Sequence, residues 1–493
     1  MAKTLDEVLR ENDPFRESQR EGVPMFWRNL PKRCTRFVVV AAQNVTRIHP
    51  GAFDCLLTYC KARKAELLVI PLLYKNVTSE YHGAAENARV WDAPLRPYLW
   101  NVRHDFNANL TLLADIRTQP TAVTPLSGFD AVSLASSAIL GHTKLQLKSV
   151  ATPQGKMAKT LTTTGAVTAE HYTDTKTGKI GGFHHSYSAT VVELDGKQFH
   201  MRQLHYSRRA DRIIDLDVAY TPRGVYRAPR ALAIAGGDTH VRFRDPQVMR
   251  GVDALAELTN PEWFVEHDLL DAYAVNPHHA GNYITLLVKV LSGADRIDEE
   301  SAEAVAYLAE RRARFPDTKV AVVGSNHNDM LGRACAAFLR GGMGALPHVS
   351  VPNAAFLAKL VARQLEGAKM TDIGASYPDA FGMIVGDAAI PGVRAVGVDE
   401  SFVLGDVELG MHGDRGPNGA RGSVRNLARI GVKSITGHGH SHEIFEGHYR
   451  VGTRTRLRAE YTHGPGSWMN TDCLLNADGK RQLITYIDGK FTR

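Results

Sequence analysis

The chain has 493 residues, 44% of them hydrophobic and 23% charged, so it can bury a large core and does not have the composition of a disordered protein. A formal net charge of +7 permits a polyanionic partner but does not require one. The five cysteines are scattered and form no CxxC pair, which argues against a disulfide framework or a thiolate zinc site. Because the N-terminus is polar and no run approaches the ~20 apolar residues of a spanning helix, we expect a cytoplasmic protein without a membrane segment.

A charged arm and a βαβ unit open the chain. Residues 1–35 are charged and interrupted by prolines, and we expect them to form an arm. Continuous apolar runs at 36–42 and 66–74 predict buried strands, and the amphipathic stretch at 51–64 predicts a helix between them. Such runs are typical of a parallel sheet that is covered on both faces.

The remainder of the first half continues as sheet. Apolar runs at 110–116 and 144–151 predict further strands. Between residues 159 and 220 the sequence alternates and is rich in Thr, Gly and Tyr, which predicts antiparallel or mixed pairing. We therefore expect an N-terminal α/β domain over residues 36–229.

A second unit, residues 230–493, begins near Arg230 and again alternates strands with helices. The predicted strands cover 231–235, 319–323 and 432–436. The predicted helices cover 302–314 and 423–430. The fold class expected for the whole chain is α/β, with mixed α+β character.

The second unit contains five clusters of side chains that can bind metal ions. They are Asp238 with His240, His267 with Asp268 and Asp271, Asn326 with His327 and Asp329, His412 with Asp414, and His438 with His440. Asp, Asn and His bind divalent ions through oxygen and imidazole nitrogen. Most clusters follow an apolar run, and open α/β sheets place their sites where strands end. The pattern indicates a phosphoesterase with two metal ions.

The spacing suits two ions that share a carboxylate. Asp238 and His240 are two residues apart in an extended turn, so both side chains can reach one ion. Asp268 is the natural bridge, because a carboxylate has two oxygens to share, and Asn326 offers a neutral carbonyl oxygen. The shells are completed by His412, His438 and His440.

The order of the clusters resembles the calcineurin-like metallophosphoesterase superfamily, whose signatures are D-x-H, GD-x-x-D, GNH-D/E, a lone His and GH-x-H. The resemblance covers about residues 230–453 and implies layered sheets with helices outside. It implies that one ion is held by Asp238, His240, Asp268 and His440. The other ion would be held by Asp268, Asn326, His412 and His438. The catalytic histidine, which is not a ligand, would be His327.

Two loops depart from the superfamily pattern. His267 stands where the superfamily has Gly, and Ser325 is an additional residue before Asn326. Asn328 displaces Asp329 by one position from the histidine that this carboxylate usually orients.

The whole chain narrows the resemblance further. Segments 38–71, 162–193 and 463–470 resemble the pre-early DNases of tailed phages that inject their genomes in two steps. This resemblance runs nearly end to end. It implies a nuclease that acts on DNA in the cytoplasm of the infected bacterium and depends on two divalent ions, manganese in the first place and magnesium as the alternative.

Other side chains are candidates for contacting the substrate or supporting the ligands. They are Asp271, His278, His279, Asp329, Arg415 and Arg421. Asp271 reads equally well as a solvated or capping carboxylate. A stripe of Arg454, Arg456 and Arg458 would share one face of a strand, which either follows a phosphate backbone or faces solvent.

The favoured function is a metal-dependent DNase that degrades host DNA early in infection, with His327 donating a hydrogen bond or proton toward the leaving oxygen. A phosphodiesterase or phosphatase for small nucleotides or phosphoproteins would use the same kind of site and stays open. The alternative of another class is a non-catalytic DNA-binding or assembly protein that works through its N-terminal half. That half also offers a surface for a homo-oligomer.

Overall fold

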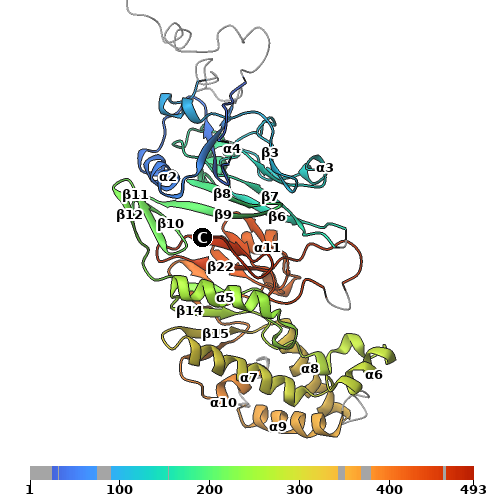
Figure 1. Ribbon diagram of the computed structural model, residues 1–493. Coiled ribbons are helices and arrows are strands. Elements are labelled where there is room, and N and C mark those ends of the chain that lie inside the picture. Colours follow the sequence, from blue (N-terminus) through green and yellow to red (C-terminus); the bar gives the residue numbers. More distant parts are fainter. Residues whose placement is uncertain are drawn as a thin grey trace, which may run out of the picture.

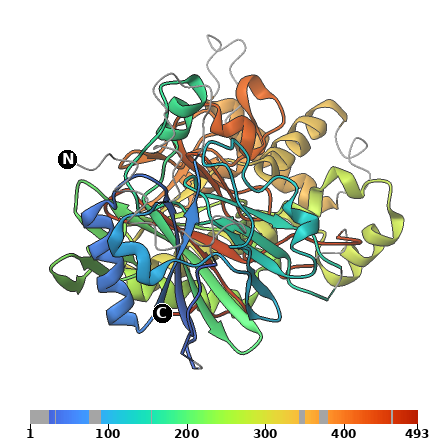
Figure 2. The same cartoon turned by 90° about the horizontal axis from the view of Figure 1, so that it is seen from above.

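The computed structural model describes residues 25–31, 33–74, 90–153, 155–341, 350–367, 379–458 and 462–493. Most of the predicted arm at residues 1–35 lies outside these ranges. The fold is of the mixed α/β class, with three sheets stacked as layers and helices over the outer faces (Figures 1 and 2). No helix in the described part of the chain is both long enough and apolar enough to cross a membrane.

The first layer is a seven-stranded sheet in the order β12-β11-β10-β9-β8-β1-β2. Its strands are β1 (Arg36–Gln43), β2 (Glu66–Leu72), β8 (Ser188–Asp195), β9 (Gln198–Ser207), β10 (Arg212–Asp215), β11 (Val218–Thr221) and β12 (Gly224–Arg227). The predicted βαβ unit is confirmed, since β1 and β2 pair in parallel and α2 (Pro50–Arg63) joins them. The alternating segment forms the antiparallel ladder from β8 to β12.

The middle layer is a ten-stranded sheet in the order β17-β18-β19-β21-β20-β6-β7-β5-β4-β3. The first half of the chain contributes β3 (His104–Asn107), β4 (Leu110–Leu112), β5 (Ser137–Leu140), β6 (Gln146–Val150) and β7 (Lys159–Thr163). The second half contributes β17 (Val403–Leu404), β18 (Val407–Glu408), β19 (Lys433–Thr436), β20 (Glu443–Phe445) and β21 (His448–Arg450). The halves join where β6 pairs antiparallel with β20. The domain boundary near Arg230 stays a prediction, and this sheet spans it.

The third layer is a six-stranded sheet in the order β16-β15-β14-β13-β22-β23. Its strands are β13 (Ala233–Ala235), β14 (Trp263–Glu266), β15 (Lys319–Val323), β16 (Val393–Val396), β22 (Thr471–Leu475) and β23 (Arg481–Thr485). The strands β13 to β16 are parallel, and β22 runs antiparallel to β13. Helices lie against this layer, namely α5 (Pro246–Thr259), α7 (Ile297–Arg314), α8 (Asn326–Gly341), α9 (Val351–Gly367) and α10 (Ala380–Asp387).

Shorter helices occupy the connections. They are η3 (Ala93–Tyr98), α3 (Phe129–Val132), α4 (Lys176–Phe183), η4 (Val241–Phe243), η5 (Tyr273–Val275), η6 (Pro277–His279), α6 (Tyr283–Ser292), η8 (Pro417–Gly419) and α11 (Val424–Ala428).

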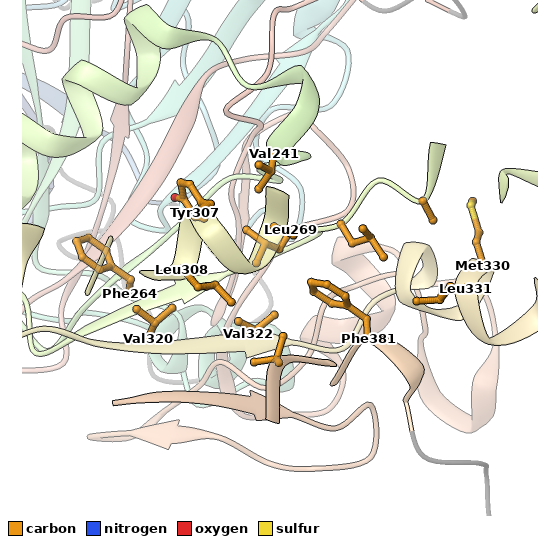
Figure 3. Packing of buried hydrophobic residues seen from close by; sticks show 14 of the residues in the cluster. Val241, Phe264, Leu269, Tyr307, Leu308, Val320, Val322, Met330, Leu331 and Phe381 are labelled. Atoms are coloured by element: carbon orange, nitrogen blue, oxygen red, sulfur yellow. The ribbon is translucent and has the colours of Figure 1, made fainter. Parts of the chain in front are cut away.

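The two faces of the six-stranded sheet enter different cores because successive strand residues point to opposite sides. On the helical face, Phe264, Val320 and Val322 pack against side chains of α7 and α10 such as Leu308 and Phe381 (Figure 3). On the other face, smaller side chains pack against the ten-stranded sheet, and this core includes Ala233, Ala235, Val265, Ala321, Ile435, Ile444 and Tyr449. Burial of each large side chain contributes roughly 1.5–3 kcal/mol. These cores hold β13, β14 and β15 so that the loops carrying Asp238, Asp268 and Asn326 leave one edge.

A buried ion network lies under that edge, and its centre is Arg454, which has no exposed side-chain surface. Its guanidinium pairs with Glu266 at 2.7 Å and with Asp472 at 2.9 Å. Glu266 also accepts a hydrogen bond from the hydroxyl of Thr239, and Asp472 accepts one from the amide of Gly237. Burial would raise the pKa of Glu266, but Arg454 and its neighbours hold it below its ordinary value. The network therefore ties the ends of two strands to the loops beyond them.

This arrangement corrects the predicted basic stripe. Arg454 is inside the protein, whereas Arg456 and Arg458 are exposed. The segment forms isolated bridges at Thr453 and Thr455 instead of a continuous strand, so alternation does not place the three arginines on one face. Arg454 cannot contact a DNA backbone in this fold.

Substitution of Arg454 tests the structural role. In Arg454→Met the two carboxylates stay buried without their cation, so we expect the free energy of unfolding to fall by about 3–5 kcal/mol. Denaturant unfolding monitored by tryptophan fluorescence measures this change. Arg456→Ala is the matched control, because this side chain is exposed, and its effect should lie within about 0.5 kcal/mol. Equal effects of the two substitutions would contradict the assignment.

Candidate metal centre

Four candidate ligands, in loops that follow strands, have a left-handed backbone conformation. The φ angles are 38° at His240, 41° at Asp268, 69° at His438 and 51° at His440. Left-handed backbone costs a non-glycine residue of order 1–3 kcal/mol and persists where the surrounding structure imposes it, often at functional sites. Four such residues in three loops turn their side chains toward one centre.

The first ligand group consists of Asp238, His240 and His440. His440 Nε2 lies 3.0 Å from Asp238 Oδ2 and 3.3 Å from His240 Nε2. Donor atoms of this kind within 4.8 Å of one another could hold a metal ion. The group joins the loop after β13 to the loop after β19.

The second ligand group consists of Asp268, His412 and His438. The side-chain oxygen of Asn326 lies beside both of its histidines. His412 Nε2 lies 3.1 Å from both Asp268 Oδ2 and Asn326 Oδ1. His438 Nδ1 lies 3.0 Å from the same amide oxygen. Asn326 is the first residue of α8, so its side chain is presented by a helix start and not by a free loop.

Asp268 lies between the two groups. Its Oδ2 is 3.1 Å from His412 Nε2 and 4.0 Å from His240 Nε2, one histidine from each group. The structure thus brings together all seven residues that the sequence assigns to the two ions, in the same two sets. It places the proposed bridging carboxylate where both sets meet.

Buried atoms of the site fit a cation. Asp268 Oδ1 is a carboxylate oxygen without solvent exposure and without a hydrogen-bond partner among the described residues. A buried carboxylate oxygen left unpaired is costly, and an ion is one of the groups that can satisfy it. Asp238 Oδ2 is enclosed as well and lies 3.0 Å from His440 Nε2, so these two atoms converge as ligands do. The donor set of oxygen and imidazole suits manganese, magnesium or another divalent ion.

Asp271 supports two histidines. Its Oδ1 lies 2.8 Å from His240 Nδ1, so it can orient the ring whose Nε2 faces the first group. Its backbone carbonyl oxygen lies 2.6 Å from His327 Nδ1. The third cluster of potential ligands, Asp271 with His240 and His327, is thus explained by hydrogen bonding without a further ion.

His327 points toward the ligands through its other nitrogen. Nε2 lies 3.8 Å from Asp268 Oδ2, and the ring packs edge-on against His240 with the ring centres 4.8 Å apart. Its Nδ1 contacts the carbonyl of Asp271, so Nε2 is the nitrogen that faces the ligand groups. Asn326 and His327 are neighbours whose side chains reach different partners, as the sequence predicts.

The displaced Asp329 has another partner. Its carboxylate pairs with Arg415, and the guanidinium of Arg415 also lies 3.5 Å from Asp414. The role expected of Asp329 by the superfamily pattern, orientation of His327, is taken by Asp271. The additional residue Ser325 is accommodated because its carbonyl accepts the amide of Asp329 in the first turn of α8.

The remaining candidates lie around the site. Arg421 is exposed and pairs with Arg415 in an isolated β-bridge of the backbone, which closes the turn at residues 416–420, just after His412. His278 is exposed on η6, and His279 packs edge-on against Tyr273 with ring centres 5.0 Å apart. Neither histidine belongs to a ligand group formed by the described residues.

Charge within the site is concentrated and buried. Burial opposes protonation of His412, yet Asp268 and Asp238 raise the pKa of His412 to about 9. Burial likewise opposes protonation of His240, but Asp271 and Asp268 raise its pKa to about 9. Burial would raise the pKa of Asp268, and His412 and His327 hold it well below its ordinary value. Without metal ions, the neighbouring carboxylates therefore favour the protonated form of His240 and His412.

Several supporting residues were not predicted. Trp468 packs edge-on against His440, with ring centres 4.2 Å apart, and buries one side of that ligand. Glu300 accepts the amides of Tyr273 and Ala274, which fixes the turn just after Asp271. Gly437 lies so close to Asp238 that a Cβ there would be 2.2 Å from Oδ1. The neighbouring GH-x-H signature could have identified Gly437. Trp468 lies in segment 463–470, which carries the phage resemblance but no ligand signature, and Glu300 lies in a segment without a motif.

The chain is similar to Protein A1 of Escherichia phage T5, with 28% identity over 481 residues that cover 93% of this chain and 83% of the relative. No known protein family matches the sequence, and no solved structure matches the chain. The similarity supports a bacteriophage origin, and the metallophosphoesterase resemblance rests on the ligand pattern and its geometry.

Proposed function

We propose that the protein is a DNase that hydrolyses DNA phosphodiester bonds with two divalent metal ions, and that it acts on host DNA inside an infected bacterium. The observation that carries the proposal is the convergence of two ligand groups on Asp268, beside a histidine that is not needed as a ligand. The relative from phage T5 supports the setting of infection. The net charge of +7 is compatible with a polyanionic substrate.

Each set of side chains has a task in this reaction. Asp238, His240 and His440 would hold one ion, and Asn326, His412 and His438 the other, with Asp268 between them. Two divalent ions bound there would supply Lewis acidity, which polarises a phosphoryl group and lowers the pKa of water. His327, held at Nδ1 by Asp271, donates from Nε2 to the leaving oxygen when its ring is protonated. Arg415 pairs with Asp329, which lies two residues after His327 on α8, and so places a positive charge near His327.

DNA cleavage with a metal series tests the proposal. Circular and linear DNA are incubated with the purified protein and manganese, magnesium, zinc or a chelator, beside a small chromogenic phosphodiester. We expect degradation of DNA that needs manganese or magnesium and stops with the chelator. Cleavage of only the small diester would favour a phosphodiesterase for small substrates. Inactivity with every metal would favour a non-catalytic DNA-binding protein.

Asp268→Asn is the matched variant for the metal site. It keeps the shape of the side chain but removes the charge that holds two cations close together. We expect occupancy of at least one ion to fall, measured by elemental analysis, and cleavage to be lost. Asp329→Asn is the control, because this carboxylate pairs with Arg415 and should leave metal content unchanged. Two tightly bound ions in active Asp268→Asn would refute the assignment.

His327 and Asn326 should separate catalysis from metal binding. His327→Ala should retain metal and bind DNA, while cleavage falls by roughly 10²-fold or more, as expected for a lost general acid. Asn326→Ala should weaken metal retention, and added metal should partly restore its activity. Measurement of metal content and single-turnover rates distinguishes the two. Loss of metal from His327→Ala with retention in Asn326→Ala would reverse the roles.

Metal binding should release protons. His240 and His412 each have a pKa near 9 in the metal-free protein, so both are protonated at pH 7 and must lose the proton to bind an ion. Calorimetry in buffers of different ionisation enthalpy should detect release of about two protons per protein. Because protons compete, metal affinity should fall as the pH is lowered from about 9. Affinity independent of pH between 6 and 8 would contradict these charge states.

A further inference from the structure

Six of the ten residues of the helix α6 are apolar and exposed. The exposed fraction is 82% for Tyr283, 77% for Ile284, 58% for Leu287 and 77% for Leu291. Val288 and Val290 are also at least half exposed. A helix that is apolar on all sides is normally covered, and a contiguous apolar patch of this kind marks an interaction surface. Figure 1 places α6 at the outer end of the helical layer, where a partner can reach it.

α6 nevertheless has defined ends and is attached to the fold through Lys289. The Asn282 side chain accepts the amide of Thr285 at its start, and Gly293 ends it in left-handed backbone with φ of 70°. Lys289, the only charged residue of α6, is buried, and its ammonium donates to the carbonyl oxygen of Tyr273. The same ammonium lies 4.5 Å from the centre of the Tyr273 ring. The exposed face of the helix is therefore preformed and carries no charge.

The exposed side chains are arranged symmetrically about Leu287. Tyr283, Leu287 and Leu291 are four residues apart and stack along one side of the helix. A second α6 crossing antiparallel at this point would bring Leu287 against its own copy and Tyr283 against the partner's Leu291. A two-fold contact uses the same patch on both subunits, and an uncharged patch meets itself without repulsion.

The size of the patch suits such a contact. Its six apolar side chains offer on the order of 500 Å² per copy, so a paired arrangement buries roughly 1,000 Å², which is what a specific interface needs. Nucleic acid would require exposed cations, and a helix lying on a membrane usually carries Lys or Arg on its polar face. The exposed face of α6 has neither.

We propose that α6 is the surface through which two copies of this chain form a dimer. The pairing is independent of the metal ions. α6 is connected to the candidate site through Lys289, which donates to the carbonyl oxygen of Tyr273. Tyr273 comes two residues after Asp271 in the chain.

Charge substitutions at Leu287 test the pairing. The full-length protein is examined by light scattering after size exclusion over a range of concentrations. The unaltered chain should have the mass of a dimer. Leu287→Glu and Leu287→Lys should each be monomeric, with the dissociation constant raised roughly 100-fold or more because every dimer loses two leucines from its centre. An equimolar mixture of the two variants should form dimers again, since Glu then faces Lys across the axis.

Controls exclude a general effect on folding. Phe183→Glu changes a side chain that is 85% exposed on α4, in the opposite part of the molecule, and should remain dimeric. Thermal unfolding of the Leu287 variants shows whether each one is folded. The proposal is overturned if the unaltered chain is a monomer. Binding of that monomer to lipid vesicles, tested by co-sedimentation, would assign the exposed face of α6 to a membrane surface. A dimer that survives Leu287→Glu, or a mixture that stays monomeric, also overturns the proposal.

Discussion

The buried pairing of Arg454 with Glu266 and Asp472 is the interaction on which the arrangement of the site depends. Glu266 ends β14, just before the loop of Asp268, and Asp472 holds the loop of Asp238 through the amide of Gly237. Gly236 lacks a Cβ because one would lie 2.5 Å from the guanidinium. The buried guanidinium of Arg454 thus fixes the positions of the loops of Asp238 and Asp268 relative to each other. Enclosed charges of this kind are costly unless all are paired, so the geometry tolerates little change.

Sequence reasoning located the elements whose signals are local. Continuous apolar runs predicted the strands β1, β2 and β15. Helical periodicity predicted α7. The start of α7 was missed, because Asp298, Glu299 and Glu300 break the apolar pattern while favouring a helix N-terminus. Asp238, Asp268 and Asn326 could be selected because β13, β14 and β15 run parallel and deliver their carboxyl ends to one edge. His412, His438 and His440 follow strands of the ten-stranded sheet and were selected by residue type and by the order of the motifs. Together these signals allowed a one-dimensional order of motifs to be read as a three-dimensional cluster.

The contacts that could not be predicted join residues far apart in the chain. Arg454 and Glu266 are separated by 188 residues, and alternation alone placed Arg454 on an exposed face. The partner of His327 is the backbone carbonyl of Asp271. Every residue has a backbone carbonyl, so the residue type does not reveal which one accepts this hydrogen bond. Trp468 reaches His440 from a separate loop. Such contacts depend on how loops pack, and neither propensity nor motif spacing carries that information.

The ten-stranded sheet has a consequence for synthesis of the chain. The hydroxyl of Ser149 on β6 donates to the carbonyl of His442 just before β20, a residue made 293 positions later. At about 5–20 residues per second, β6 leaves the ribosome roughly 15–60 s before its neighbour exists. During that time its edge is an open template for pairing with other nascent chains. Yield of folded protein should therefore depend on slow expression and on chaperones more than on the final stability of the native state.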